Sequence, residues 1–298
     1  MNHSSTKKVV SKWRHLPNIF SIPVPKADYR VRYGPNVLNF MDIRIPKKPG
    51  PHPVLFVLHG GFWKAEYNLD HIGHLCSAFT KLGVATCNVE YRRVGHVGGG
   101  WPGTFQDLAL ALDKLGELGR EHNFDPDRIV VLGHSSGGHL AFWLAGLHKL
   151  ESSELCRYNP SMRFSAAVSL AGILDLRDAW RLGVGTKVLG KLLGGTPEKF
   201  PGRYNMTSPA ALLPLGIRQL LIHGKRDRVV PYTMSEHYYK LASSLGDDVT
   251  LLPLPTGHFG LIDPYSKVWS SVVAWILPLL GFKETFQSLD DFTHRLDV

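Results

Sequence analysis

The chain has 298 residues, of which 44% are hydrophobic and 20% are charged. These proportions exclude an intrinsically disordered protein and allow one large hydrophobic core, or at most two small domains. The net charge of +9 comes from scattered lysines and arginines with only a mild cluster near the N-terminus, so we interpret it as a solvated basic surface. Because no nucleic-acid-binding motif accompanies the charge, we expect no nucleic-acid partner.

The terminal segments and the cysteines predict a cytoplasmic location. The first 15 residues lack the apolar stretch of a secretory signal. The apolar run 268–282 is too short to span a bilayer and contains Pro278. Three cysteines, Cys76, Cys87 and Cys156, are an odd number without metal-binding spacing, which is typical of a reduced compartment. We therefore expect no membrane span, no metal and no cofactor.

Short apolar runs alternate with longer helical patterns along the chain. We expect strands at 37–45, 53–61, 84–91, 128–133, 164–172, 217–224 and 248–255. We expect helices at 69–83, 103–122, 136–150, 231–246 and 268–282. Alternation of this kind predicts the α/β class, with a mostly parallel central sheet of about eight strands and helices on both faces.

The segment 173–216 interrupts this alternation between two expected strands. It is rich in Gly, Leu and Arg and is long for a connection. Long connections usually have a function, often that of a lid over a binding site. We predict one domain over residues 1–298, with a small helical cap inserted at 173–216 and a tail at 283–298.

A pair of serines flanked by glycines follows the strand expected at 128–133. In the sequence GHSSG (133–137), only Ser135 has a glycine two residues before it and two residues after it. These glycines allow a sharp turn from strand to helix that exposes the serine hydroxyl. Ser135 is therefore the candidate nucleophile, and a glycine-rich turn that only begins a helix is the alternative.

The sequence HGGFW (59–63) comes directly after the apolar strand that begins at residue 53. Glycines after a strand let backbone amides approach a developing oxyanion. We expect the amides of Gly61, Phe62 and Ser136 to form an oxyanion hole. A simple turn that ends the strand is the alternative, but it does not explain His59 or the aromatic pair.

An aspartate and a histidine follow the last two expected strands. Asp227 lies after the strand at 217–224, and His258 lies in a glycine-flanked loop after the strand at 248–255. Such a carboxylate can orient an imidazole that accepts the proton of a serine nucleophile. A turn or capping role is the alternative for Asp227. Among 15 histidines, the positions of His59, His134 and His139 suit support of the site better than base catalysis.

The chain order Ser135, Asp227, His258 is the order found in α/β hydrolases. These motifs resemble the α/β-hydrolase superfamily over about residues 35–280, specifically the serine-esterase branch related to hormone-sensitive lipase. HGGFW is similar to the HGGXW motif of arylformamidases, which implies that the amides of Gly61 and Phe62 form the oxyanion hole. The segments VEYRR, GGGWPGTFQD and GHSSGGHLA resemble feruloyl and acetylxylan esterases, and the C-terminal part resembles prolyl-oligopeptidase-type catalytic domains.

Other residues near these motifs allow two interpretations each. Trp63 and Trp101 either line a pocket for an acyl or aryl group or belong to the core. Glu90 and Asp107 are expected to tie the loop 91–103 to the core rather than to act in catalysis. The arginines at 177, 181 and 203 could meet a carboxylate of the substrate, although exposed arginines need no such explanation.

The resemblance and the triad together predict a serine hydrolase that cleaves carboxylic esters through an acyl-enzyme. The alternatives are an arylformamidase that hydrolyses a formamide C–N bond of the N-formylkynurenine type, a small peptidase, and a hydrolase-fold protein that binds a ligand without turnover. The expected partner is a small-molecule ester or amide, and the sequence leaves the oligomeric state open.

Overall fold

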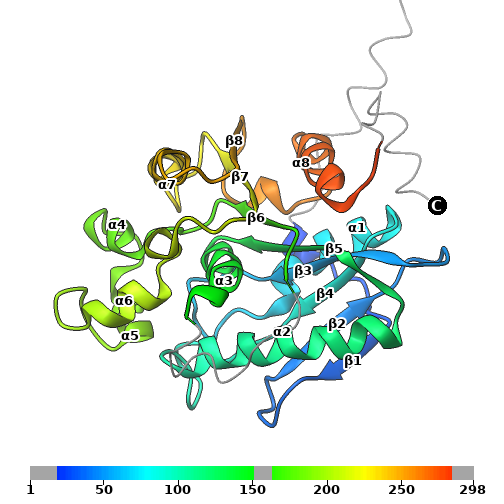
Figure 1. The fold of residues 1–298 in the computed structure, drawn as a ribbon, viewed down its shortest axis with the longest axis horizontal. Coiled ribbons are helices and arrows are strands. Elements are labelled where there is room, and N and C mark those ends of the chain that lie inside the picture. The colour runs from blue at the N-terminus through cyan, green and yellow to red at the C-terminus, as the bar shows by residue number, and fades with distance from the viewer. Residues whose placement is uncertain (1–18, 151–162, 284–298) are drawn as a thin grey trace, which may run out of the picture.

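An eight-stranded sheet in the order β1-β2-β4-β3-β5-β6-β7-β8 runs through the molecule. The computed structural model describes residues 19–150 and 163–283 (Figure 1). The strands are β1 Tyr29–Arg32, β2 Phe40–Arg44, β3 His52–Leu58, β4 Ala85–Val89, β5 Phe124–His134, β6 Ala166–Leu170, β7 Arg218–Gly224 and β8 Val249–Leu254. Strands β3 to β8 pair in parallel, whereas β1 with β2 and β2 with β4 are antiparallel. The prediction of a mostly parallel sheet of about eight strands is confirmed.

Helices cover both faces of this sheet. The α-helices are α1 Gly73–Lys81, α2 Gly103–Glu121, α3 Ser136–Ala145, α4 Leu176–Arg181, α5 Thr186–Leu193, α6 Pro201–Thr207, α7 Tyr232–Ser244 and α8 Trp269–Ile276. Short 3₁₀ turns are η1 Ile19–Ser21, η2 Leu69–Ile72, η3 Leu147–Leu150, η5 Pro209–Leu212, η6 Phe259–Leu261 and η7 Leu277–Leu280. Helices α2, α3 and α7 share one buried cluster with the sheet, and α1 and α8 share the other.

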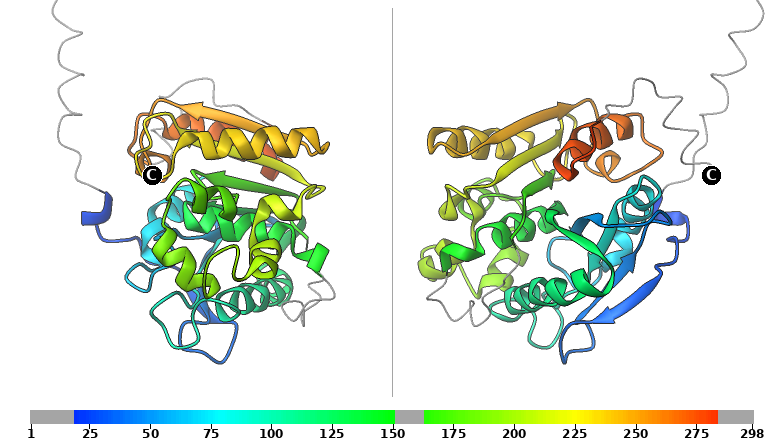
Figure 2. Two further views of the ribbon diagram at one scale, coloured as in Figure 1. Left: turned by 90° about the vertical axis from the view of Figure 1, so that its left-hand side faces the viewer. Right: turned by 45° about the vertical axis from the view of Figure 1, so that its right-hand side comes forward.

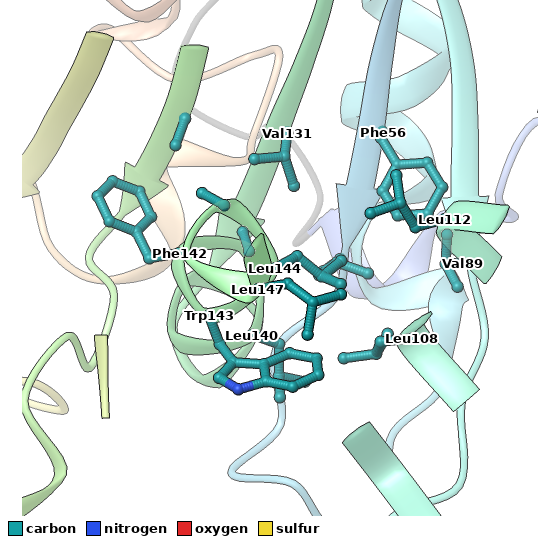
Figure 3. Close-up of a cluster of buried hydrophobic side chains, with 14 of the residues drawn as sticks. Phe56, Val89, Leu108, Leu112, Val131, Leu140, Phe142, Trp143, Leu144 and Leu147 are labelled. Carbon is teal, nitrogen blue, oxygen red and sulfur yellow. The ribbon is translucent and has the colours of Figure 1, made fainter. Parts of the chain in front are cut away.

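Strand β3 shows why both faces are covered. Val54, Phe56 and Leu58 point into the cluster of α2 and α3, whereas Leu55 and Val57 point into the cluster of α1 and α8. Successive side chains of a strand point to opposite faces, so a fully apolar strand needs cover on both sides. Figure 3 shows the first cluster, where side chains of α3 meet Phe56 and the leucines of α2. The central strands are therefore held firmly, and so are the residues that directly follow them.

Three of the expected helices are α-helical over only part of their length, and a 3₁₀ turn forms the rest. The segment 69–83 divides into η2 and α1, 136–150 into α3 and η3, and 268–282 into α8 and η7. Helix α3 ends at Gly146, whose amide donates to the carbonyls of Phe142 and Trp143. Pro278 lies in η7 and lacks the N–H that would continue α8.

Strand β1 is absent from the sequence-based prediction. Its four residues include two arginines, and none of them is buried. Arg30 pairs with Asp42 of β2 and stacks over the Phe40 ring, with 2.7 Å between Arg30 Nε and Asp42 Oδ1. An edge strand of this kind is held by its neighbour rather than by an apolar pattern of its own.

The segment 173–216 folds into α4, α5, α6 and η5 between β6 and β7 (Figure 1). These helices lie together at one end of the molecule and face the viewer in the left view of Figure 2. Helix α5 buries its apolar side in the cluster shared with α2, and the amide of Trp101 donates to the carbonyl of Leu192 over 2.7 Å. The segment is thus anchored beside the loop that precedes α2.

Of the predicted tail 283–298, only residue 283 lies within the described residues, and Cys156 also lies outside them. Among the helices of residues 19–150 and 163–283, none has the length and apolar character that a bilayer crossing requires.

Candidate active site

Ser135 lies in the turn between β5 and α3 with a strained backbone. Its φ of 56° and ψ of −123° are unusual for a residue with a side chain. Such conformations cost of order 1–3 kcal/mol and persist where the surrounding structure enforces them. The amide of Ser135 donates to the carbonyl of Leu170 in β6, which ties the turn to the sheet. The turn has the geometry of a nucleophile elbow.

The two glycines around Ser135 are required by close backbone contacts. A Cβ at Gly133 would overlap the carbonyl oxygen of Gly137, and a Cβ at Gly137 would overlap that of Leu58. Strands β3 and β5 and the start of α3 therefore meet without space for a side chain. This close approach is the physical reason for the G-x-S-x-G spacing, and it favours Ser135 over Ser136 as the nucleophile.

The loop after β3 lies directly beside Ser135. A Cβ at Gly60 would come within 3.1 Å of Ser135 Cβ, and Gly61 has a φ of 113° that favours glycine. Among the described residues, the amides of Gly61 and Phe62 have no hydrogen-bond acceptor. Two unpaired amides beside a serine hydroxyl are suited to bind an oxyanion.

Ser136 links this loop to α3. Its hydroxyl oxygen accepts a hydrogen bond from the amide of Trp63 over 3.3 Å. Its own amide is at the first turn of α3, where the N–H groups have no partner within the helix. The predicted third oxyanion donor therefore lies at a helix N-terminus, where negative charge is stabilised.

Asp227 and His258 form a buried hydrogen-bonded pair. His258 Nδ1 lies 2.6 Å from Asp227 Oδ2, and both side chains are almost fully buried. Asp227 Oδ1 accepts hydrogen bonds from the amides of Val229 and Val230. Burial acts to raise the pKa of Asp227, but hydrogen bonds from His223, His258 and the backbone outweigh it and hold this pKa well below its usual range. A charged Asp227 accepts a hydrogen bond from His258 Nδ1–H, and in this tautomer of the neutral imidazole the lone pair on Nε2 is available as a base.

A chain of histidines connects the Ser135 turn to His258. The His134 ring lies 4.5 Å from the His258 ring, and His134 Nε2 lies 3.1 Å from the His258 carbonyl oxygen. Since a carbonyl only accepts, His134 Nε2 donates, and His134 Nδ1 accepts from His71 Nε2 over 2.9 Å. Among the described residues, Ser135 and His258 share no direct hydrogen bond, and His258 is in contact with His134 of this turn. Sequence reasoning missed His71, which it placed only in a helix.

A second buried network, formed by His59, Glu90 and Arg93, adjoins the loop of Gly60 and Gly61. Arg93 forms ion-paired hydrogen bonds with Glu90, and Arg93 Nη1 lies 2.7 Å from His59 Nε2. Glu90 also accepts from the amides of Leu69 and Tyr91. Burial acts to raise the pKa of Glu90, but the hydrogen bond and charge of His59 and the charge of Arg93 keep it below its usual value. Glu90 thus has the structural role that we expected, because it binds His59 before this loop and the amide of Leu69 after it.

We predict that Glu90→Gln lowers the free energy of unfolding by about 3–5 kcal/mol, because it leaves the Arg93 guanidinium buried without an opposite charge. Chemical denaturation with urea measures this loss. Glu66→Gln is the control, since Glu66 is exposed and lies 3.8 Å from Lys64. Its loss should stay below about 1 kcal/mol. Equal losses for both variants would contradict the buried network.

Buried histidines around the site make the fold sensitive to acid. Burial lowers the pKa of His139 to about 4 and that of His71 to about 3, and it lowers that of His134 as well. His139 accepts from Trp63 Nε1 and donates to the carbonyl of Thr207, so both of its nitrogens are bonded in the neutral form. The unfolded chain binds these protons near pH 6.5, whereas the folded chain does not.

We therefore predict that the free energy of unfolding falls between pH 7 and pH 5, by about 2 kcal/mol for each of His71 and His139, and that His134 adds to the fall. The folded state loses stability on acidification because the unfolded state binds more protons than the folded state over this range. Urea denaturation at the two pH values measures the fall. His139→Gln should reduce it by about 2 kcal/mol, and an unchanged fall would show that His139 titrates alike in both states.

The other residues singled out in the sequence differ in burial and in their contacts. Trp63 is fully buried, which favours packing over contact with a substrate, whereas Trp101 is half-buried and lies 5.9 Å from the Phe105 ring. Asp107 accepts hydrogen bonds from the amide and guanidinium of Arg92 and so ties the loop to α2, as expected. The Arg203 guanidinium lies 5.6 Å from the centre of the Trp101 ring.

The positions of these residues at the carboxyl ends of β5, β7 and β8 are those of an α/β hydrolase. Solved structures agree on the fold: a truncated carbohydrate esterase from gut microbiota superimposes with a TM-score of 0.71 at 21% identity, over 85% of this chain and 95% of that one. The chain belongs to the BD-FAE family, whose model matches residues 41–241. The prediction of an α/β-hydrolase fold is thereby confirmed.

Two curated relatives come from Mycobacterium tuberculosis. The esterase LipQ is 26% identical over 280 residues, which are 87% of this chain and 64% of LipQ. The probable carboxylic ester hydrolase LipM is 29% identical over 196 residues, which are 61% of this chain and 43% of LipM. The chain thus spans less than two thirds of the length of either relative.

Proposed function

We propose that this protein is a serine hydrolase that cleaves carboxylic esters through an acyl-enzyme. The observation that carries the proposal is the strained Ser135 turn beside the Asp227–His258 pair, whose histidine ring packs 4.5 Å from His134. The esterase relatives and the BD-FAE family match support the same reaction class.

In the proposed reaction, Ser135 Oγ attacks the ester carbonyl carbon while His258 Nε2 takes the hydroxyl proton. The C–O bond to the alcohol then breaks, and the alcohol leaves with the proton from His258. Water repeats the sequence on the acyl-enzyme and releases the acid. Asp227 holds the imidazole in the required tautomer through the 2.6 Å bond.

The tetrahedral intermediate carries a negative oxygen that needs donors. The amides of Gly61, Phe62 and Ser136 are the proposed donors, supported by the unpaired state of the first two and by the helix N-terminus at the third. Loss of one such donor typically raises the barrier by about 3 kcal/mol. The Glu90–Arg93–His59 network would hold Gly61 and Phe62 in place.

We also propose that residues 173–216 act as a cap over this site within one domain. A cavity of about 710 Å³ supports this, because it lies between Phe62 of the oxyanion loop and the start of α5. A Cβ at Gly185 would come within 2.8 Å of the Phe62 ring, so the two segments are in close contact. The cap would then form one wall of the substrate site.

We propose that the protein is located in the cytoplasm. We propose that its partner is a small-molecule ester. Cys76 and Cys87 are both buried as unpaired thiols. Burial raises the pKa of Cys76 to about 12, and burial likewise raises that of Cys87. Such thiols are unreactive core residues that need no oxidising compartment.

Two measurements on the full chain test the proposed function. A fluorophosphonate probe should label Ser135, as shown by mass spectrometry of the labelled peptide. p-Nitrophenyl esters of increasing acyl length should be hydrolysed with a burst of nitrophenol when deacylation is slow.

The same panel includes N-formylkynurenine, feruloyl esters and peptide amides. Faster cleavage of N-formylkynurenine than of every ester would favour the arylformamidase alternative. Preferred cleavage of peptide amides would indicate a peptidase. Absence of both labelling and hydrolysis would favour a binding protein and contradict the proposal.

A further inference from the structure

A second cavity, of about 790 Å³, adjoins the proposed catalytic residues on the side of His258. Three of the residues that line it touch the catalytic elements. Tyr67 packs so closely on Gly61 that a Cβ there would overlap it, and His71 Nε2 lies 2.9 Å from His134 Nδ1. Phe259 follows His258 in the chain, with 5.1 Å between the two ring centres. The cavity is therefore in contact with the oxyanion loop, the Ser135 turn and the histidine loop together.

Aromatic rings surround this cavity and remain open to it. Four of the lining side chains, Phe20, Tyr67, Phe259 and Tyr265, are each between 43% and 50% exposed. Phe20 and Phe259 meet edge to face, with 5.3 Å between their centres. Ring faces exposed around one cavity can bind apolar groups, and they bind organic cations through the negative charge of the π face.

The charged side chains that line this cavity favour an organic cation over a neutral apolar group. Its charged side chains are Glu66, Asp70 and Asp263, and no lysine or arginine is among the described residues that line it. This is unusual for a protein with a net charge of +9. Burial lowers the pKa of His71 to about 3, so its ring adds no positive charge near neutral pH. The other histidine that lines the cavity, His74, donates from Nε2 to the carbonyl of Ile22 over 3.1 Å. Lys64 lies 3.8 Å from Glu66, which leaves Asp70 and Asp263 as the stronger acidic contribution.

Asp263 is the most buried of these three carboxylates, since Glu66 and Asp70 are exposed. It is half-buried, one of its oxygens accepts from the amide of Tyr265 over 2.9 Å, and no ion pair reaches it from the described residues. Burial raises the pKa of Asp263 above its usual value, and this effect outweighs the hydrogen bond from the Tyr265 amide and the charge of His74. A positive ligand in the cavity would compensate the charge of this half-buried carboxylate more closely.

We propose that this cavity binds the alcohol half of the ester and that this alcohol carries a positively charged ammonium group. The proposal rests on the proposed esterase function. The alcohol receives its proton from His258, so it leaves on the side where Phe259 and the cavity lie. The cavity beside α5 is lined instead by Lys64, Lys187 and Lys191 together with Glu66, and this excess of lysines disfavours a cation there.

The test compares a cationic ester with its uncharged analogue of the same shape. Butyrylcholine and 3,3-dimethylbutyl butyrate differ only in a quaternary nitrogen or carbon. Their dissociation constants are measured by calorimetry on full-length Ser135→Ala, which removes turnover. We expect butyrylcholine to bind about tenfold more tightly, in the range of a cation–π contact combined with a carboxylate. Equal binding, or tighter binding of the uncharged ester, would overturn the proposal in favour of a neutral alcohol.

Further substitutions in the Ser135→Ala protein test which residues cause the preference for butyrylcholine over the uncharged ester. Asp263→Asn should reduce it to within about twofold, and Tyr265→Leu should reduce it independently by removing a ring. Asp113→Asn is the matched control, because Asp113 is exposed on α2, a helix that packs on the opposite face of the sheet from α1. This control should keep the full preference. A preference that survives both cavity variants would place the cation elsewhere and overturn the assignment.

Turnover of the two esters by the wild-type chain is measured separately. Tight binding of butyrylcholine without hydrolysis of any ester would contradict the esterase function while supporting the cation site. Hydrolysis of esters without a cation preference in binding would support the esterase function and overturn the cation site.

Discussion

Ser135→Ala is expected to lower kcat by about 10⁶-fold and to retain the fold. The loss follows because the other groups of a serine triad act only through the hydroxyl, so that its removal costs nearly all of their contribution. The remaining rate would come from the oxyanion donors and from substrate binding. Single-turnover kinetics with a p-nitrophenyl ester measure the loss, and circular dichroism checks the fold.

Ser135→Gly is the matched control for the strained turn. Glycine adopts the φ of 56° without the steric cost that serine and alanine share. Ser135→Gly should therefore be equally inactive but more stable than Ser135→Ala by about 1 kcal/mol in urea denaturation. Appreciable activity in either variant would exclude Ser135 as the nucleophile. Equal stability would show that the turn is unstrained in solution.

Asp227→Asn is expected to lower kcat by about 10⁴-fold. The side-chain oxygen of asparagine can still accept from Val229 and Val230, so the turn remains supported. Its amide group would then face His258 Nδ1 and favour the tautomer with the proton on Nε2. A protonated Nε2 cannot accept the proton of Ser135.

Asp247→Asn separates this effect from a loss of turn structure. Asp247 also accepts two backbone hydrogen bonds, from Leu215 and Gly216, but it lies before β8 rather than at the end where His258 follows. We expect kcat of this variant to stay within about twofold of wild type. A similar loss of kcat in both variants would assign a structural role to Asp227.

The sharp turn at Ser135 could be predicted from the sequence because the G-x-S-x-G spacing that indicates it lies within five residues. A Cβ at Gly133 would overlap the carbonyl of Gly137, four residues further along the chain, whereas the contact of Gly137 with Leu58 of β3 appears only in the folded structure. The central strands could be predicted for a similar reason. A run such as 53–58 is apolar at every position and needs cover on both faces.

The supporting contacts could not be predicted, because each joins side chains far apart in the chain. His71 and His134 are 63 residues apart, and Trp63 and His139 are 76 residues apart. Nothing in the pattern around His71 separates it from a residue that only continues a helix. Strand β1 was missed for the same reason, since Arg30 is held by Asp42 and Phe40 of the neighbouring strand.

By itself, the sequence determined the alternation of strands and helices and the place of Ser135, because both depend on residues adjacent in the chain. Only the tertiary structure decided which buried groups stay neutral and which cavity carries acidic residues, because burial and charge depend on what other segments bring alongside. Asp263 shows the difference: its residue type is ordinary in the sequence, and its half-buried place among the exposed rings of a cavity appears only once the loop beside His258 is folded.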